Sequence, residues 1–563
     1  MIPPYFRILL TYVLLFPFLC FSKADERVCD QTLAPTLLEQ EPQLEFSVSP
    51  GNKTSSLEAT VTINGKKISV PHAMVVRLCA SLAKASSYAS KTAHVRTIST
   101  RPSLCNDEIV FLEKRNLVAA QAASGLIGRT IDPAHMPRIA VIGSGGSMHA
   151  ALALGGLLKS FDASGLLQTT HYVAGVSGST WLISAWLASG KSYSEFFKDY
   201  TERVAEGLIP NTLKGIGGYV GDFVDALAQT FLRRLFYGEI PTIIDFWGLV
   251  IGLECLDKKS RDDYSNTSLC SQLQNFSSGN APCPIYTAIN PINKNTAFQW
   301  VEFSPFEVMN YGLNAAVPTF GFGRQFNTGT SINNHPPLEL GYLMGIWGSA
   351  ISITLREIYT MFLSNLEPKE LFAPLKDLIM ETPIGQLRVF PAHIRNPTHD
   401  MHGMPDSKSS FHIYLDAGMD INLPFVPLLK PERKVDLIIA CDDGGDTYFA
   451  GALKNAAAWA KVNNIPFPTI DYHVAESNIF SVFDDGPDSQ APVLIYLPAI
   501  TNPRFDPNYD PFVKGYHGVT SLEWTQHQID QITGLMEMAG DEAKQTIVEV
   551  IDRLAQRKAA KVY

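Results

Sequence analysis

Two successive segments of the chain repeat the order strand, glycine-serine turn, helix. Residues 139–142 form a short apolar run, followed by a Gly/Ser turn and a helix-like stretch at 148–161. Residues 172–174 form a second such run, again followed by a Gly/Ser turn and a helix-like stretch at 180–188. Consecutive strands that are joined through helices run parallel, and the helices cover the sheet. We therefore predict an α/β fold with a mainly parallel central sheet flanked by helices.

Composition narrows the class of protein. Hydrophobic residues make up 46% of the 563 residues and charged residues 18%, which is typical of a globular chain with a large core. The 45 basic and 55 acidic residues give a net charge of −10, and no basic stretch could follow a phosphate backbone. We expect no nucleic-acid partner.

The N-terminus resembles a secretory signal. Arg7 precedes an apolar run over residues 8–21, and small residues follow at the positions where cleavage occurs. The alternative is a membrane anchor, but the run is shorter than the roughly 20 residues that a span needs, and Pro17 interrupts it. We predict a signal peptide over residues 1–24 and a secreted product.

The rest of the chain is divided by composition. Residues 25–100 are predicted to form an N-terminal segment that leads into a catalytic domain at 101–563. The apolar stretch at about 205–285 is predicted to be a helical cap over an acyl-chain pocket, with ordinary core as the alternative.

Secretion would bring glycans and disulfides. Asn52, Asn266 and Asn275 each begin an Asn-x-Ser/Thr sequon. Seven cysteines remain after cleavage, and an oxidising compartment favours pairing most of them, with buried Cys441 as the expected free thiol. The cysteines at 255, 270 and 283 contain no Cys-x-x-Cys pair, so we expect neither a metal nor a cofactor.

The second turn, Gly175-Val176-Ser177-Gly178-Ser179, has the setting of a nucleophile elbow. A sharp turn between strand and helix exposes the serine hydroxyl, and small neighbours permit the strained backbone. Ser179 replaces the usual last glycine, so an ordinary Gly/Ser turn is the alternative. We predict Ser177 as a nucleophile.

The first turn, Gly143-Ser144-Gly145-Gly146-Ser147, suits an oxyanion hole. Backbone N–H groups at a helix start stabilise the anion of a tetrahedral intermediate. A dinucleotide-binding loop is the alternative, but Met148 stands where that fingerprint needs its third glycine. The predicted donors are Gly145, Gly146 and Ser147.

Together with later motifs, these turns resemble one family, the catalytic domain of cytosolic phospholipase A2 and fungal phospholipase B (lysophospholipase), over roughly residues 100–510. The matching motifs are Gly143-Ser144-Gly145-Gly146, Gly175-Val176-Ser177-Gly178-Ser179-Thr180-Trp181, Trp300-Val301-Glu302-Phe303-Ser304-Pro305-Phe306-Glu307-Val308, Phe320-Gly321-Phe322-Gly323-Arg324, Trp347-Gly348-Ser349, Leu415-Asp416-Ala417-Gly418 and Asn422-Leu423-Pro424. The resemblance implies a patatin/phospholipase-like fold and a substrate that is a phospholipid or lysophospholipid at a membrane or micelle surface.

The resemblance also implies a Ser/Asp dyad, here Ser177 and Asp416. Asp416 follows the strand-like residues 411–415, at the loop end where parallel sheets present catalytic groups, although an aspartate before Ala-Gly is also a common turn former. The second candidate acid is Asp443, which resembles the aspartate-glycine motif of patatin lipases.

The sequence departs from the family at the first turn. Ser147 replaces a glycine, and His149 stands where the family has an arginine held to engage the substrate phosphate. Imidazole offers no fixed-charge, bidentate phosphate contact, so His149 is at most a weaker head-group contact. The leading hypothesis is a secreted lysophospholipase or phospholipase B. The alternatives are a neutral-lipid esterase or acyltransferase, and a non-catalytic lipid-binding relative.

Overall fold

A computed structural model describes most of the chain. The described residues are 44–50, 57–63, 66–70, 90–98, 104–207, 219–237, 241–291, 298–349, 392–512 and 524–560, with four single residues between them, Val76, Cys79, Tyr88 and Glu239. The chain divides into two compact units. The smaller unit comprises residues 1–87, 211–249 and 352–391, and the larger comprises 88–210, 250–351 and 392–563.

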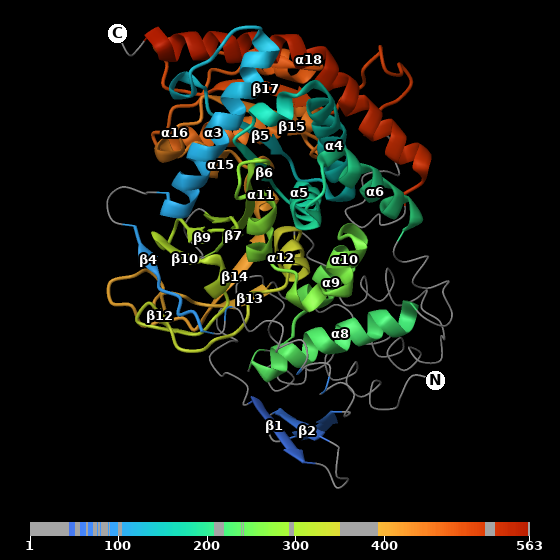
Figure 1. Ribbon diagram of the computed structural model, residues 1–563, viewed down its shortest axis with the longest axis vertical. Helices are drawn as coiled ribbons and strands as arrows, with labels where there is room; N and C mark the ends of the chain where they lie inside the picture. Colours follow the sequence, from blue (N-terminus) through green and yellow to red (C-terminus); the bar gives the residue numbers. More distant parts are fainter. Residues whose placement is uncertain are drawn as a thin grey trace, which may run out of the picture. The chain divides into compact units, whose positions relative to one another are not determined.

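The described part of the larger unit is built on a twelve-stranded mixed sheet (Figure 1). Its centre is parallel, in the order β17 (Val493–Pro498), β15 (Leu437–Asp442), β5 (Ile139–Gly143), β6 (Tyr172–Gly175), β7 (Cys283–Asn290). The flanks are antiparallel: β16 (Ser481–Phe483) on one side, and β8 (Gln299–Phe303), β9 (Glu307–Asn310), β10 (Ala315–Pro318) and β4 (Arg96–Thr97) on the other. A further pair, β13 (Ala392–Arg395) and β14 (Phe411–Asp416), joins β7 through β14. The predicted fold class is confirmed, with the parallel strands at the centre.

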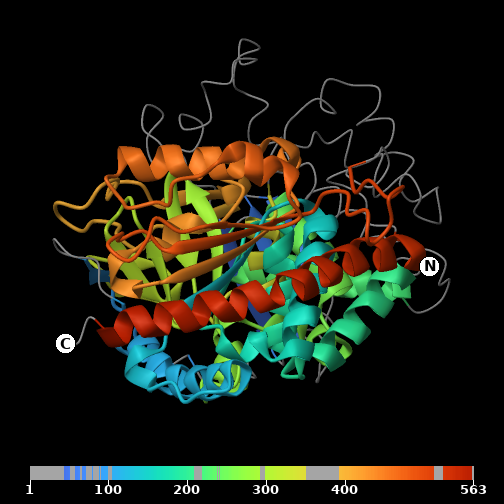
Figure 2. The same cartoon turned by 90° about the horizontal axis from the view of Figure 1, so that it is seen from above.

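Helices cover both faces of this sheet. In Figure 2, α3 (Asn106–Ile127) and α4 (Ser147–Ser164) lie below the strands, and α16 (Gly451–Val462) lies above them. The 35-residue C-terminal helix α18 (Gln526–Ala560) packs along α4 and contacts α3. The remaining elements of the larger unit are α5 (Gly178–Ser189), α6 (Tyr193–Glu206), α10 (Lys258–Asp262), α11 (Leu273–Phe276), α12 (Leu340–Trp347), α15 (Phe425–Leu428), α17 (Tyr472–Ser477), β11 (Phe326–Asn327), β12 (Thr330–Ser331) and short 3-10 turns, among them η11 (Pro431–Arg433).

Local sequence explains where these helices begin, end and approach one another. Ser192 and Glu195 form a capping box at the start of α6. Gly128 and Gly165 end α3 and α4 in the left-handed conformation that glycine adopts without strain. At Gly156 of α4 an added Cβ would overlap the backbone of α18, so the absence of a side chain there permits the close crossing of the two helices.

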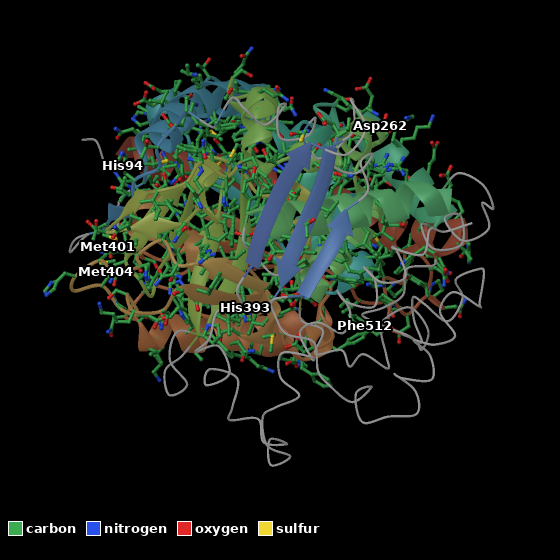
Figure 3. All side chains as sticks on the ribbon, turned by 90° about the horizontal axis from the view of Figure 1, so that it is seen from below. His94, Asp262, His393, Met401, Met404 and Phe512 are labelled. Carbon is green, nitrogen blue, oxygen red and sulfur yellow. The ribbon has the colours of Figure 1, made fainter. Side chains whose placement is uncertain are left out.

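The smaller unit contains an antiparallel three-stranded sheet of β1 (Leu44–Pro50), β2 (Leu57–Ile63) and β3 (Lys66–Val70), which Figure 3 shows side by side. It also contains α8 (Tyr219–Phe236) and the first half of α9 (Ile243–Cys255). The predicted domain bounds stay predictions. Of the predicted cap at 205–285, residues 211–249 group with the smaller unit, and residues 205–210 and 250–285 group with the larger one. Contacts in space, and not the order along the chain, decide this grouping.

The cysteines correct one expectation. Cys441 is buried and unpaired on β15, as predicted, but Cys79, Cys105, Cys255, Cys270 and Cys283 are free thiols too. The prediction that most cysteines pair is therefore wrong for the described ones. Cys255, Cys270 and Cys283 lie on separate elements, and burial raises the pKa of the Cys255 and Cys270 thiols to about 12, which keeps them protonated.

Two of the three sequon asparagines use their side chains inside the fold. Asn266 Nδ2 donates to Asp263 (2.8 Å), and Asn275 Nδ2 donates to the carbonyls of Leu187 (2.8 Å) and Ala188 (3.3 Å). Asn52 and the predicted signal peptide lie outside the described residues. Among the helices that the structure describes, none is long and apolar enough to cross a membrane.

Candidate active site

Ser177 lies at the junction between β6 and α5. Its backbone has φ 49° and ψ −121°, a conformation that is uncommon for a residue with a side chain. Residues 171–176 and 178–187 around it are buried, and Ser177 alone among them is partly exposed. At Gly178 an added Cβ would overlap the carbonyl of Ser147, so only glycine fits there. The local geometry is that of the predicted elbow.

The first glycine turn packs directly against this serine. An added Cβ at Gly145 would lie 3.0 Å from Ser177 Cβ, and Gly146 and Ser147 both have positive φ, 155° and 58°. The Gly145 N–H donates to the carbonyl of Asn422 (3.2 Å). Of the three predicted oxyanion donors, Gly145 therefore uses its N–H inside the fold, and Gly146 and Ser147 stand at the start of α4.

The strand register brings the ends of β6 and β14 together. Gly175 of β6 pairs with Tyr286 of β7, and Asp416 of β14 pairs with Ala288. Because β8 occupies the other edge of β7 over these residues, β6 and β14 must share one edge. The two strands run towards each other along this edge. Their last residues pair with β7 residues that are two positions apart, a distance of about 7 Å along the strand. Ser177, two residues beyond Gly175, and Asp416 therefore face the same gap in the sheet.

Asp416 is fully buried and its loop contacts the nucleophile turn. Its Oδ1 accepts the Gly418 N–H at 2.8 Å. An added Cβ at Gly418 would lie 3.1 Å from Asp416 Oδ1 and 3.4 Å from Cγ1 of Val176, the residue before Ser177. The hydrogen bond orients the carboxylate, while burial removes it from competing water.

Asp443, the alternative acid, is engaged elsewhere. Its Oδ2 is in a buried hydrogen bond with Nδ1 of His149, and its backbone N–H donates to Ser144 Oγ at 2.7 Å. The His149 ring also faces Trp524, with ring centroids 5.9 Å apart. His149 is only 2% exposed, so its imidazole is the partner of Asp443 and not a solvent-facing head-group contact. No hydrogen bond between described residues joins a histidine to Ser177.

Asn422 is a site residue whose role the sequence did not reveal. Its carbonyl accepts the Gly145 N–H, and its Nδ2 donates to the Gly145 carbonyl at 3.0 Å. Its Oδ1 occupies the space where both Gly145 and Gly418 lack a Cβ. Asn422 thus joins the glycine turn to the Asp416 loop. The Asn422-Leu423-Pro424 motif marked the position, but a motif alone does not say which atoms meet.

The loop after β15 is held by a second buried carboxylate. Asp442 accepts hydrogen bonds from Tyr496 Oη (2.6 Å) and from Thr447 Oγ1 (3.2 Å). Burial raises the pKa of Asp442 to about 6, against the effect of these donors. No group of three or more metal-ligating side chains occurs in the part of the chain that the structure describes.

Comparison with known proteins identifies the family. The profile of the lysophospholipase catalytic domain matches residues 139–452, more than half of the chain. The chain belongs to this family. It is similar to mouse cytosolic phospholipase A2 zeta, 26% identical over 70% of this chain and 53% of the relative, and to human cytosolic phospholipase A2 epsilon, 25% identical over 71% and 52%. The chain thus spans about half the length of the curated relatives it matches.

Solved structures agree on the fold. Human GIVD cytosolic phospholipase A2 superposes with a TM-score of 0.67 at 18% identity, over 92% of this chain and 79% of that one. The same enzyme in complex with methyl gamma-linolenyl fluorophosphonate superposes with a TM-score of 0.62. The resemblance inferred from the sequence motifs is confirmed at the level of family and fold.

Proposed function

We propose that this chain hydrolyses fatty-acyl esters of phospholipids and lysophospholipids at a membrane or micelle surface, with Ser177 as nucleophile and Asp416 as its base. One observation carries the proposal: a partly exposed serine in strained backbone faces the gap where the Asp416 strand ends. Family membership supports a phospholipid-type substrate.

The reaction follows from these positions. Asp416 accepts the Ser177 hydroxyl proton as Oγ attacks the ester carbonyl carbon, and the carbonyl electron pair moves onto oxygen. The amides of Gly146 and Ser147 stabilise that oxyanion, a contribution of about 3–4 kcal/mol per donor. The dipole of α5, which begins at Gly178, adds positive potential. The C–O bond breaks, and the leaving alkoxide takes the proton from Asp416.

An acyl-Ser177 ester remains. Asp416 then accepts a proton from water, and the resulting hydroxide attacks the acyl carbon. The second tetrahedral intermediate collapses, the serine oxygen recovers the proton, and a fatty acid is released.

Substitution of Ser177 and of the two candidate acids, Asp416 and Asp443, tests the assignment of nucleophile and base. Purified Ser177→Ala and Asp416→Asn variants should each lose at least about a thousandfold in kcat on lysophosphatidylcholine. Asp443→Asn should retain far more activity, because its carboxylate is paired with His149. Wild-type activity in Ser177→Ala, or a larger loss in Asp443→Asn than in Asp416→Asn, would contradict the dyad.

A second candidate is a neutral-lipid esterase or acyltransferase. It is favoured by the buried His149–Asp443 pair at the position of the family's arginine, since no guanidinium is offered to a phosphate there. Equal kcat/KM on a phosphate-free monoacylglycerol and on lysophosphatidylcholine would select it. A non-catalytic lipid binder would instead fail to label at Ser177 with a fluorophosphonate probe.

Export is a separate proposal, which rests on the apolar N-terminal segment alone. We propose that residues 1–24 are cleaved and that glycans attach at Asn52 and Asn266. The two hydrogen bonds of Asn275 Nδ2 disfavour occupancy there, because a glycan would replace one of its hydrogens. Expression in secretory cells, followed by N-terminal sequencing and a glycosidase mobility shift for each Asn→Gln variant, tests this. Retention of residues 1–24 in the mature chain would contradict it.

A further inference from the structure

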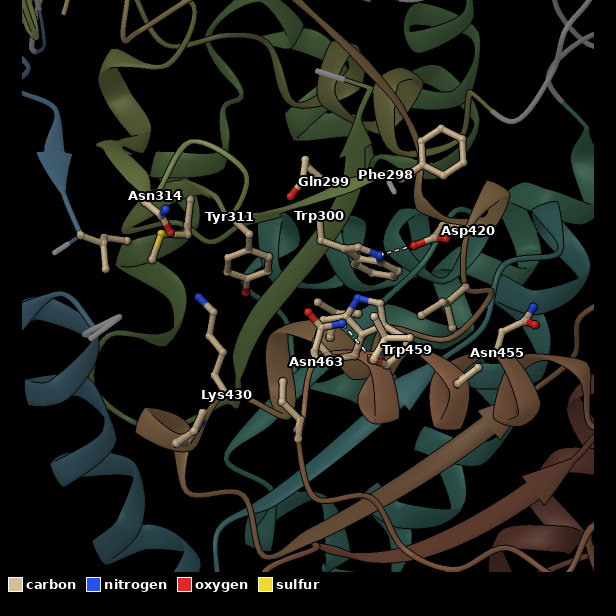
Figure 4. A pocket seen from close by; sticks show the side chains of 18 of the residues that line it. Phe298, Gln299, Trp300, Tyr311, Asn314, Asp420, Lys430, Asn455, Trp459 and Asn463 are labelled. Atoms are coloured by element: carbon tan, nitrogen blue, oxygen red, sulfur yellow. Dashed lines mark hydrogen bonds between the residues drawn. The ribbon is translucent and has the colours of Figure 1, made fainter. Parts of the chain in front are cut away.

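The larger unit contains a pocket of about 690 Å³ between β8, β9 and α16 (Figure 4). Neither Ser177, Asp416 nor the glycine turn lines it. Several lining residues are exposed, among them Phe298 and Val462, which are 36% and 81% exposed. The pocket therefore opens to solvent independently of the candidate active site, and its volume is that of a small-molecule site.

One half of the pocket is aromatic and acidic. Trp300 from β8 and Trp459 from α16 line it together with Phe298, and Figure 4 shows these rings with Asp420 on the same side of the pocket. The Trp300 Nε1–H donates to Asp420 Oδ2 at 2.7 Å. Trp300 is itself buried, so this hydrogen bond positions the Asp420 carboxylate in the lining, while Trp459 is partly exposed. Indole faces attract cations most strongly of the aromatic side chains.

The charges of the lining favour a cation. Asp420 and Glu432 contribute two carboxylates. Oε2 of Glu432 is buried and has no hydrogen-bond partner among the described residues, and burial raises the pKa of Asp420, whose one donor among those residues is the Trp300 N–H.

The lining also contains one cation, Lys430, which is directed elsewhere. Its Nζ lies 3.8 Å from the centre of the Tyr311 ring and 3.6 Å from Glu302 Oε1. Burial lowers the pKa of Lys430 to about 8. In Figure 4 Lys430 points towards Tyr311, at the opposite side of the pocket from Asp420.

We propose that this pocket binds the quaternary ammonium group of a choline-type ligand, whose methyl groups pack on Trp459 and Phe298 while Asp420, held by the buried Trp300, neutralises the charge. A quaternary ammonium has no N–H to satisfy, so it needs aromatic faces and a nearby carboxylate and no directed hydrogen-bond acceptor. A purely apolar ligand would leave both carboxylates uncompensated, and an anionic one would be repelled by them. This second site goes beyond the proposed hydrolytic activity and does not depend on it.

Calorimetric titration of the full chain with choline tests the charge requirement. Choline should bind, and its neutral isostere 3,3-dimethyl-1-butanol should bind at least about tenfold more weakly. Asp420→Asn and Trp459→Leu should each weaken choline binding by a similar factor. Asp262→Asn on exposed α10 and Phe449→Leu, whose ring is 69% exposed outside the pocket, are matched controls that should bind as wild type.

Two further ligands distinguish a soluble source of the choline group from a lipid source. Binding of glycerophosphocholine in solution would indicate a soluble metabolite, whereas binding of lysophosphatidylcholine micelles alone would indicate a lipid interface; either supports the site. Equal binding of choline and the isostere, no binding of any choline ligand, or undiminished binding by folded Asp420→Asn overturns it. The thermal midpoint of each variant confirms folding. Active-site labelling of Ser177 is measured on the same samples, so that failure of this site is distinguishable from failure of the hydrolase.

Discussion

Three residues of the candidate active site have an unusual backbone conformation. Gly146, Ser147 and Ser177 have positive φ within two short turns, although two of the three carry a side chain. A residue with a Cβ in this region costs about 1–2 kcal/mol, so the surrounding packing must impose the conformation. The overlap that any side chain at Gly178 would have with Ser147 shows how closely the two turns approach. The oxyanion donors and the nucleophile are thus fixed relative to one another by backbone contact.

Gly178→Ala tests this contact. The methyl group would force the two turns apart, so we expect kcat to fall at least about a hundredfold and the thermal midpoint to drop by several degrees. Gly125→Ala is the matched control: Gly125 lies inside α3 with open space at its Cβ position, and alanine there should stabilise the chain by about 0.5–1 kcal/mol. An active, stable Gly178→Ala enzyme would disprove the need for close turns.

At the scale of elements, the site depends on loops from distant parts of the sequence. The glycine turn between β5 and α4 meets the loop after β14 through Asn422, 277 residues away from Gly145. The end of β14 in turn meets the end of β6 on one edge of β7. A local disturbance at Asn422 should therefore alter catalysis more than it alters the fold.

Asn422→Ala removes the side-chain half of the link to Gly145. Losing this partly buried hydrogen bond should cost about 1 kcal/mol of unfolding free energy, while kcat should fall at least about tenfold with little change in KM. Asn280→Ala, which removes an exposed side-chain bond to the Asn275 carbonyl, is the control for a simple asparagine deletion. If the two variants lose the same activity, Asn422 has no positioning role.

For the whole molecule, much of the fold was predictable from local sequence. The two apolar runs at 139–142 and 172–174 with their turns predicted parallel strands, and β5 and β6 pair in parallel at the centre of the sheet. The pairing of β14 with β7, the role of Asn422 and the burial of His149 against Asp443 were not predictable, because they depend on contacts between residues far apart in sequence. The disulfide expectation failed because it rested on compartment and not on geometry.

A buried charge cluster connects three elements of the larger unit. Arg433 of η11 is bound by Glu302 of β8 at 2.7 and 2.9 Å and by Glu108 of α3 at 3.2 Å. Tyr311 donates to Glu302, and Tyr172 donates to Glu108 at 2.8 Å. With Lys430 beside Glu302, two cations and two anions balance inside the protein. Such a cluster stabilises only while all its members keep their charges.

Glu302 gives this cluster a pH dependence. Burial alone would raise its pKa, but Arg433 and Lys430 lower it to about 2 from an ordinary 4.5. Because the folded pKa is the lower one, the stabilisation, roughly 3 kcal/mol, is fully present above pH 4.5 and is lost as pH falls from 4.5 towards 2.

In urea titrations between pH 3 and 7, Glu302→Gln should be about 3–5 kcal/mol less stable at pH 7 and should lose less further stability on acidification than wild type. Glu537→Gln, which removes an exposed ion pair with Lys159, should change stability by under about 1 kcal/mol and keep the wild-type slope. Parallel acid profiles for wild type and Glu302→Gln would show that another carboxylate controls acid unfolding.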